Sequence, residues 1–214
     1  MIRYLLADLF KSQRWLPPVF VYLAATAILY GGDPGTPLPP YGVSAMMLFP
    51  LAAWLTVVLV NNEDPVQRHV TLAAVGGWRR LLASLVGAAA VLNGVLVLLA
   101  TFVPAVIHHH PYALSDVVLG FVAHVISAVT GIGLGVLCAR PIIPTTGWSL
   151  VAVVGVSLVV LAVANRLPPV GAMAHLLFDP APVPALAVAV QVAVAIVVGV
   201  ACVGVAYRVG RRRF

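Results

Sequence analysis

The chain has 214 residues, of which 62% are hydrophobic and only 8% are charged, against roughly 25% charged residues in an average soluble domain. A chain with so little charge cannot cover a water-facing surface, which excludes a soluble globular protein and makes lipid the expected solvent. The net charge of +6 comes from basic residues scattered in ones and twos between apolar runs, and this pattern argues against nucleic-acid binding.

Residues 1–15 are predicted to form an amphipathic helix. Apolar and charged side chains fall on opposite halves of a helical wheel in this segment. A helix of this kind lies in the membrane interface with its basic face on anionic headgroups, and Pro17-Pro18 then lets the chain turn into the bilayer. Charges interrupt every apolar run here, so the segment is not typical of a cleavable signal. The apolar set is Ile2, Leu5, Leu6, Leu9 and Phe10, and the charged set is Arg3, Asp8, Lys11 and Arg14.

Six apolar segments, separated by turn residues and charges, predict six transmembrane helices. Six spans of about 20 residues with short loops use nearly the whole length, so residues 1–214 form one all-α integral membrane domain. A further apolar stretch, residues 170–178, is short enough to be a helix that dips into the interface. The spans are predicted at residues 18–30, 44–60, 81–107, 117–139, 148–164 and 185–207.

The stretch between the second and third spans carries a strong local signal. Asp64 before Pro65 is typical of a helix start, with a capping carboxylate followed by proline at the first position. Gly76-Gly77 is typical of a helix stop. We therefore expect a short helix over residues 65–75, on the same side of the membrane as the basic loops; an ordinary loop helix is the alternative.

The orientation follows from the basic residues. One side of the predicted topology collects eleven of the twelve, and only Arg166 falls on the other. Because cytoplasmic loops are enriched in Lys and Arg, this bias places both termini in the cytoplasm and supports an even number of spans.

The chemistry within the spans is sparse. No Asp, Glu, Lys or Arg lies inside a predicted span, which disfavours ion-driven transport because a coupling ion needs an ionisable partner at membrane depth. Four polar side chains, Asn93, His124, Thr130 and Gln191, either line a translocation path or hold helices together by hydrogen bonds. The chain has no phosphate-binding loop, since its single lysine, Lys11, follows Phe10 and not glycine.

Catalytic and metal sites are also poorly supported. Ser157 lacks the second flanking glycine expected of an intramembrane serine protease. Three consecutive histidines point their side chains in different directions in either a helix or a strand, so they rarely bind one metal ion. We therefore expect His108-His109-His110 to lie in a hydrated loop at the membrane interface. We expect no catalytic residue, no metal and no cofactor on this chain.

At this point the chain resembles the membrane subunits of type-2 ABC exporters, the ABC-2 permease family. The resemblance covers the whole length: an interfacial N-terminal helix, six spans and a cytoplasmic helix after the second span. The closest local likeness lies in residues 61–68 and 76–80, which resemble the coupling helix that contacts the ATPase in such permeases. By this resemblance the ATPase-coupling residues are Glu63, Asp64, Pro65, Arg68, Gly76, Gly77, Arg79 and Arg80.

The resemblance implies a bacterial cytoplasmic-membrane exporter subunit that pairs with a second copy or a related permease. Each permease would contact a separate ABC ATPase, which carries the ATP and Mg. Few polar residues lie in the spans, so an apolar or amphipathic cargo such as a lipid, drug or peptide antibiotic is expected. The alternative is a non-transporting six-span membrane protein, such as an assembly factor or immunity protein, and an intramembrane enzyme is a more distant one.

Overall fold

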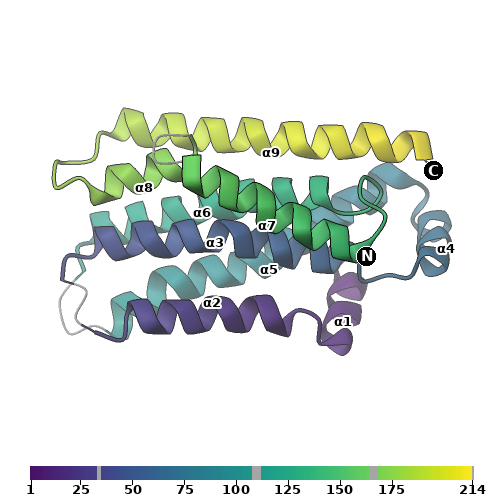
Figure 1. The fold of residues 1–214 in the computed structure, drawn as a ribbon, viewed down its shortest axis with the longest axis horizontal. Coiled ribbons are helices and arrows are strands. Elements are labelled where there is room, and N and C mark those ends of the chain that lie inside the picture. The colour runs from purple at the N-terminus through teal and green to yellow at the C-terminus, as the bar shows by residue number, and fades with distance from the viewer. Residues whose placement is uncertain (33–34, 108–111, 164–167, 214) are drawn as a thin grey trace.

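The computed structural model describes residues 1–32, 35–107, 112–163 and 168–213, and every regular element in these ranges is an α-helix. Figure 1 shows long helices side by side in one bundle, with α1 and α4 at the end where both termini lie. The nine helices of the described ranges are α1 (Ile2–Ser12), α2 (Leu16–Leu29), α3 (Leu38–Val60), α4 (Pro65–Val75), α5 (Trp78–Ile107), α6 (Leu114–Cys138), α7 (Thr146–Val163), α8 (Val170–Phe178) and α9 (Ala185–Arg213).

The short helices agree closely with expectation, and the long ones are longer than expected. The predictions over residues 65–75 and 170–178 are confirmed by α4 and α8. Helix α3 begins six residues before the expected span, because Pro39 and Pro40 sit in its first turn, where their missing N–H groups cost nothing. Helix α9 continues to Arg213, since arginine is a good helix former.

Five of the helices, α3, α5, α6, α7 and α9, are long and apolar enough to cross a membrane. The chain is therefore a multi-span helical membrane protein. The first of the six predicted spans is α2, which has only 14 residues. At 1.5 Å per residue it is ~21 Å long, less than the ~30 Å hydrocarbon core. In Figure 1, α2 runs from α1 towards the opposite end of the bundle.

Helix α3 lies at the centre of the bundle and packs most closely against α6. A Cβ atom added at Gly131 would lie 2.6 Å from the carbonyl oxygen of Phe49, and one at Gly135 would lie 2.6 Å from that of Ala53. The two backbones approach this closely only because both positions lack a side chain. The glycines of α6 therefore permit the close approach of the two helices.

Helix α1 turns its apolar face to protein. Leu5 and Leu9 are buried in the same cluster as Leu81 and Leu85 of α5. A Cβ atom at Gly87 would lie 2.8 Å from Cδ1 of Ile2, so α5 also offers α1 a close approach. The amphipathic helix therefore packs against the bundle through its apolar side, and its charged side faces outward.

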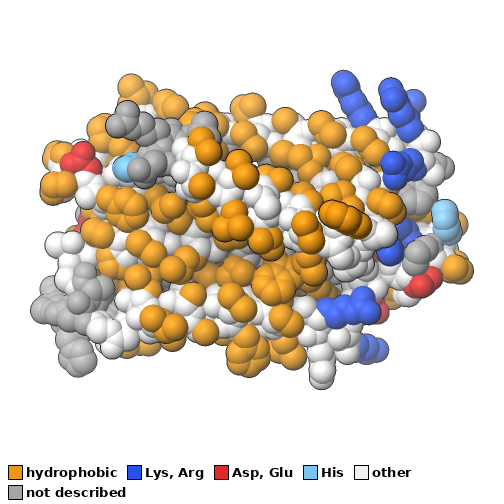
Figure 2. All heavy atoms as spheres, viewed as in Figure 1, with side chains coloured by type: hydrophobic (Ala, Val, Ile, Leu, Met, Phe, Trp, Pro, Cys, Tyr) orange, Lys and Arg blue, Asp and Glu red, His pale blue; other side chains and the backbone are white. Residues whose placement is uncertain are grey.

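Basic side chains collect at one end of the molecule, as predicted. Figure 2 shows the Lys and Arg side chains at the end of α1, α4 and the C-terminus, and orange hydrophobic side chains along the bundle between the ends. His108, His109, His110 and Arg166, and the last residue of the predicted fifth span, lie outside the described residues.

Candidate functional site at the basic end

Helix α4 is defined at both ends by the signals seen in the sequence. The Oδ1 atom of Asp64 accepts a hydrogen bond from the backbone N–H of Val66 at 2.9 Å, and Pro65 occupies the first turn. Gly76 and Gly77 have φ angles of 80° and 119°, values that favour glycine, and both donate their N–H groups to the carbonyl of Leu72. These contacts make α4 a short helix with fixed ends.

The inner face of α4 is fastened to the end of α3. Arg68 donates from Nη2 to the carbonyl of Val60, the last residue of α3, at 2.6 Å. Thr71 donates from its hydroxyl to Oε1 of Glu63 at 2.9 Å. The last carbonyls of a helix lack internal donors and carry partial negative charge, so a guanidinium there both fills a hydrogen bond and opposes the helix dipole.

Arg68 and Glu63 are only 2% and 3% exposed. Arg68 lies on the inner face of α4 and Glu63 in the turn before it, so neither side chain is exposed to a partner, and their role in ATPase coupling stays a prediction. Burial lowers the pKa of the Arg68 guanidinium, while the nearby Glu63 carboxylate raises it and Arg140 lowers it further. Both residues support α4 from below.

The outer face of α4 carries apolar side chains. Val66 is 74% exposed and Val70 is 66% exposed, and Ala73 is exposed on the same side. The spacing of four and three residues places the three in one line along the helix. This line points away from the bundle at the basic end.

Helix α1 is joined to α4 and to its preceding turn by two side-chain hydrogen bonds. The Nε2 atom of Gln67 donates to the hydroxyl of Tyr4 at 2.6 Å. The Nδ2 atom of Asn62 donates to Oδ2 of Asp8 at 2.5 Å. Sequence reasoning missed both pairs, because nothing in either segment indicates how α1 and α4 meet.

The turn between α6 and α7 is tied to the end of α3 through Asn61. Its Nδ2 atom donates to the hydroxyl of Ser149 at 3.3 Å, and its Oδ1 atom accepts from the backbone N–H of Arg140 at 3.1 Å. The end of α3 is therefore linked to α7 through the hydrogen bonds of Asn61, and α4 is linked to α5 by the short turn that joins them.

The remaining predicted coupling residues border α4. Arg79 and Arg80 are exposed, and Arg80 donates from Nη1 to the carbonyl of Val75 at 3.5 Å, at the limit of a hydrogen bond. A surface hollow of about 440 Å³ lies between α4 and the end of α9. It is lined by His69, Leu72, Ala73, Gly76, Gly77 and Arg213.

A second polar cluster lies inside the bundle and is centred on Ser44 of α3. The hydroxyl of Ser44 is 2.9 Å from Nε2 of His124 on α6, and Tyr22 of α2 donates to the carbonyl of Ser44 at 3.4 Å. The Nδ1 atom of His124 lies 2.7 Å from the carbonyl of Gly120, so Nδ1 carries the proton and Nε2 accepts from Ser44. His124 and Ser44 are both fully buried. This cluster holds three helices together.

The four residues proposed for a path are not joined to one another. Asn93 donates to the carbonyl of Ala89 at 2.9 Å, and Thr130 donates to that of Ile126 at 2.6 Å, each within its own helix. Gln191 is half-buried on α9. Within the described part of the chain, none of the four hydrogen-bonds to another, so hydrogen bonding gives no support for a shared path.

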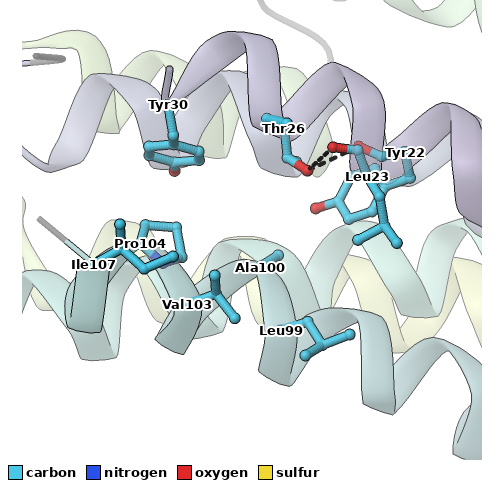
Figure 3. Close-up of a pocket in the computed structure, with 10 residues that line it drawn as sticks. Tyr22, Leu23, Thr26, Tyr30, Leu99, Ala100, Val103, Pro104 and Ile107 are labelled. Carbon is cyan, nitrogen blue, oxygen red and sulfur yellow. Dashed lines mark hydrogen bonds between the residues drawn. The ribbon is translucent and has the colours of Figure 1, made fainter. Parts of the chain in front are cut away.

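An apolar cavity of about 370 Å³ separates α2 from α5 (Figure 3). Tyr22, Thr26 and Tyr30 face it from α2, and Val103 and Pro104 face it from α5. The Thr26 hydroxyl donates to the carbonyls of Tyr22 and Leu23 in its own helix, at 2.9 and 3.0 Å. Apart from the tyrosine hydroxyls, the cavity therefore offers hydrocarbon.

Within the described ranges, no three His, Cys, Asp or Glu side chains lie close enough to hold a metal ion. Comparison of the chain with known protein families, with characterised proteins and with solved structures found no match in any of the three.

Proposed function

We propose that this chain is the membrane-spanning subunit of an ATP-driven exporter of the ABC-2 kind, with six spans and both termini in the cytoplasm. The chain itself is non-catalytic, and ATP and Mg are bound by a separate ATPase. A second copy or a related permease completes the transporter.

The observation that carries the proposal is the outer face of α4. Val66, Val70 and Ala73 form an apolar line on a helix at the basic end of the bundle. In the proposed orientation this line faces the cytosol, where exposed apolar surface is typical of protein contact sites. The exposed Arg79 and Arg80 beside it favour a partner with acidic groups around an apolar pocket.

The inner face of α4 supports a mechanical role. Arg68 fixes α4 to the end of α3, Glu63 fixes it to the connecting turn, and Trp78 begins α5 directly after the Gly76-Gly77 turn. A partner that pushes on α4 therefore displaces the ends of two spans together. A flexible loop would absorb such a push.

The cavity between α2 and α5 supports an apolar or amphipathic cargo. It is lined almost entirely by hydrocarbon, and few polar groups are available to bind a polysaccharide. Helix α2 is then the first of the six crossings, and it is short because the chain reaches it through α1 and the Gln13 turn.

Affinity purification from native membranes tests the ATPase partnership. Wild-type chain is expected to recover an ABC ATPase, identified by mass spectrometry, and Val70→Asp is expected to lose it. Leu114→Asp is the matched control, because Leu114 is 79% exposed but lies at the start of α6, at the other end of the bundle. A stable wild-type chain that recovers no ATPase contradicts the proposal and favours a non-transporting membrane protein.

Thiol labelling in intact cells tests the six-span topology. In a chain with Cys138 and Cys202 replaced, cysteine at the exposed positions Gly32 and Ala181 is expected to react with an impermeant reagent. Cysteine at Gln67 is expected to be shielded until the membrane is opened. Labelling of position 67 in intact cells, or shielding of position 32, contradicts the proposed crossings.

Cargo export is expected to persist when the proton gradient is collapsed and ATP is maintained. The reason is that no carboxylate lies within the central part of a described span to carry a coupling proton. Export that stops with the gradient while ATP is unchanged contradicts ATP-driven transport.

A further inference from the structure

The outward face of α1 is basic and aromatic. Arg3, Phe10 and Lys11 are exposed, and Arg14 is exposed in the turn that follows. Phe10 packs edge-on against Trp15, with ring centroids 5.2 Å apart. Figure 2 shows basic side chains at this end of the bundle, next to the hydrophobic belt.

No negative charge competes on this face. The only acid of α1, Asp8, is half-buried and accepts the hydrogen bond from Asn62. The apolar side chains of Leu5 and Leu9 are buried against α5 and do not face outward. Helix α1 and the turn after it therefore present three exposed cations, Arg3, Lys11 and Arg14, together with the Phe10–Trp15 ring pair, at the end of the bundle where the apolar belt stops.

We propose that this face of α1 is a binding site for the headgroups of anionic phospholipids, and that its occupancy is transmitted to α4. Each basic side chain at a membrane surface favours anionic over zwitterionic lipid, and aromatic rings are favoured at the same depth. The ligand is the phosphodiester headgroup of a lipid in the leaflet nearest the basic end, since the site borders the belt that the acyl chains cover.

The route to α4 consists of the two hydrogen bonds between the elements. Tyr4 accepts from Gln67 on α4, and Asp8 accepts from Asn62 in the turn before it. Both acceptors lie on α1, so headgroups that hold α1 in place also hold α4 in place. Membrane composition then sets how firmly α4 is held, whichever partner α4 has.

Lipid selectivity tests the first half of the proposal and needs neither ATPase nor cargo. The full chain is placed in nanodiscs of phosphatidylcholine with phosphatidylglycerol, and the lipids retained on the protein are counted by native mass spectrometry. The triple variant Arg3→Gln/Lys11→Gln/Arg14→Gln is expected to lose preference for phosphatidylglycerol, by about fivefold for each charge removed.

The matched control removes three cations from the same end of the molecule. Arg208→Gln/Arg211→Gln/Arg212→Gln alters the end of α9, away from α1, and is expected to keep the wild-type preference. Equal loss in both triples would mean that only total charge matters and would overturn the site. An unchanged preference in the α1 triple would overturn it as well.

Hydrogen exchange of α4 tests the second half. In wild type, amides of α4 are expected to exchange several-fold more slowly in nanodiscs with phosphatidylglycerol than in phosphatidylcholine alone. Tyr4→Phe/Asn62→Leu removes both hydrogen bonds without changing any charge, and is expected to keep lipid selectivity but lose this response.

Ser12→Ala is the control for exchange, because the Ser12 hydroxyl bonds only to the carbonyl of Leu9 and the N–H of Arg14, within α1 and the turn that follows it. It is expected to respond to lipid as wild type does. A lipid response that survives in Tyr4→Phe/Asn62→Leu, or that is absent in wild type, would overturn the transmission to α4. Neither outcome bears on the ATPase partnership, which the purification experiment tests separately.

Discussion

Two junctions of α3 are built by opposite means. Inside the bundle, α3 is joined to α6 where Gly131 and Gly135 remove side chains and let the backbones touch. At the basic end, Arg68 joins α4 to the last residue of α3, and the Thr71–Glu63 hydrogen bond joins α4 to the turn between the two helices. Lipid gives no hydrophobic drive for one helix to meet another, so van der Waals contact must do it there. At the basic end, hydrogen bonds fasten α4 while Val66, Val70 and Ala73 on its outer face stay exposed.

The largest expected effect is on the glycine junction. Gly131→Ala and Gly135→Ala each place a Cβ 2.6 Å from a backbone oxygen of α3, which cannot rotate away. Each is expected to destabilise the bundle by about 1–3 kcal/mol. Thermal unfolding in detergent measures this. Gly94→Ala is the control, because nothing lies within 4 Å of its added Cβ, and it is expected to gain about 0.5–1 kcal/mol. Equal effects at all three positions would contradict the close-contact explanation.

Loss of the hydrogen bond between α4 and the end of α3 is expected to destabilise α4 alone. Arg68→Ala removes the hydrogen bond to Val60 and should lower the free energy of opening α4 by about 1.5–3 kcal/mol. Hydrogen exchange of the α4 amides measures that opening, and the thermal midpoint of the bundle is expected to change little. Arg79→Ala, at an exposed position, is the control and should leave exchange unchanged. If Arg68→Ala instead melts the whole bundle, the two junctions are not independent.

The cap of α4 is expected to contribute less. Asp64→Ala removes the acceptor for the Val66 N–H and should cost about 1 kcal/mol at the first turn of α4. Asp64→Ser keeps an oxygen in a capping position and should restore most of the loss. Exchange of the first amides of α4 distinguishes the two variants. Identical exchange in Asp64→Ala and wild type would show that the turn is held by other contacts.

The smallest effect is expected on the other side of α6. A Cβ at Gly133 lies 3.2 Å from Cβ of Cys202 and 3.3 Å from Cα of Gly199, both on α9. A shift of α9 by a few tenths of an ångström relieves this contact, since α9 is lightly covered by the rest of the chain. Gly133→Ala should therefore cost under about 0.5 kcal/mol in the same unfolding assay. A loss as large as that of Gly131→Ala would show that α9 is held as rigidly as α3.

Local signals in the sequence predicted the short helices well. The Asp64-Pro65 start and the Gly76-Gly77 stop depend on backbone capping, which is decided within a few residues, and α4 has the expected bounds. The positions of the long apolar helices also follow from hydropathy alone. Their ends differ because Pro39-Pro40 and the C-terminal arginines are compatible with helix as well as with loop.

The faces of the elements could be predicted only in part. Periodicity shows that α1 has an apolar face, but not that α5 covers it. Arg68 was identified as a residue of the coupling segment, but nothing in the sequence indicates that its side chain is buried against the end of α3. The Ser44–His124 contact joins residues 80 apart in the chain. No pattern within one helix can indicate a partner at that distance.

The gathering of charge at one end gives the molecule an electrical polarity. Eleven basic residues and three acidic ones, Asp8, Glu63 and Asp64, belong to segments at the end of the bundle that holds α1, α4 and the C-terminus, a net of eight positive charges. Carrying one charge across a membrane potential of about 100 mV changes the free energy by about 2.3 kcal/mol, so carrying the net charge of this end across would change it by roughly 18 kcal/mol. A membrane potential therefore discriminates strongly between the two possible insertions of the chain.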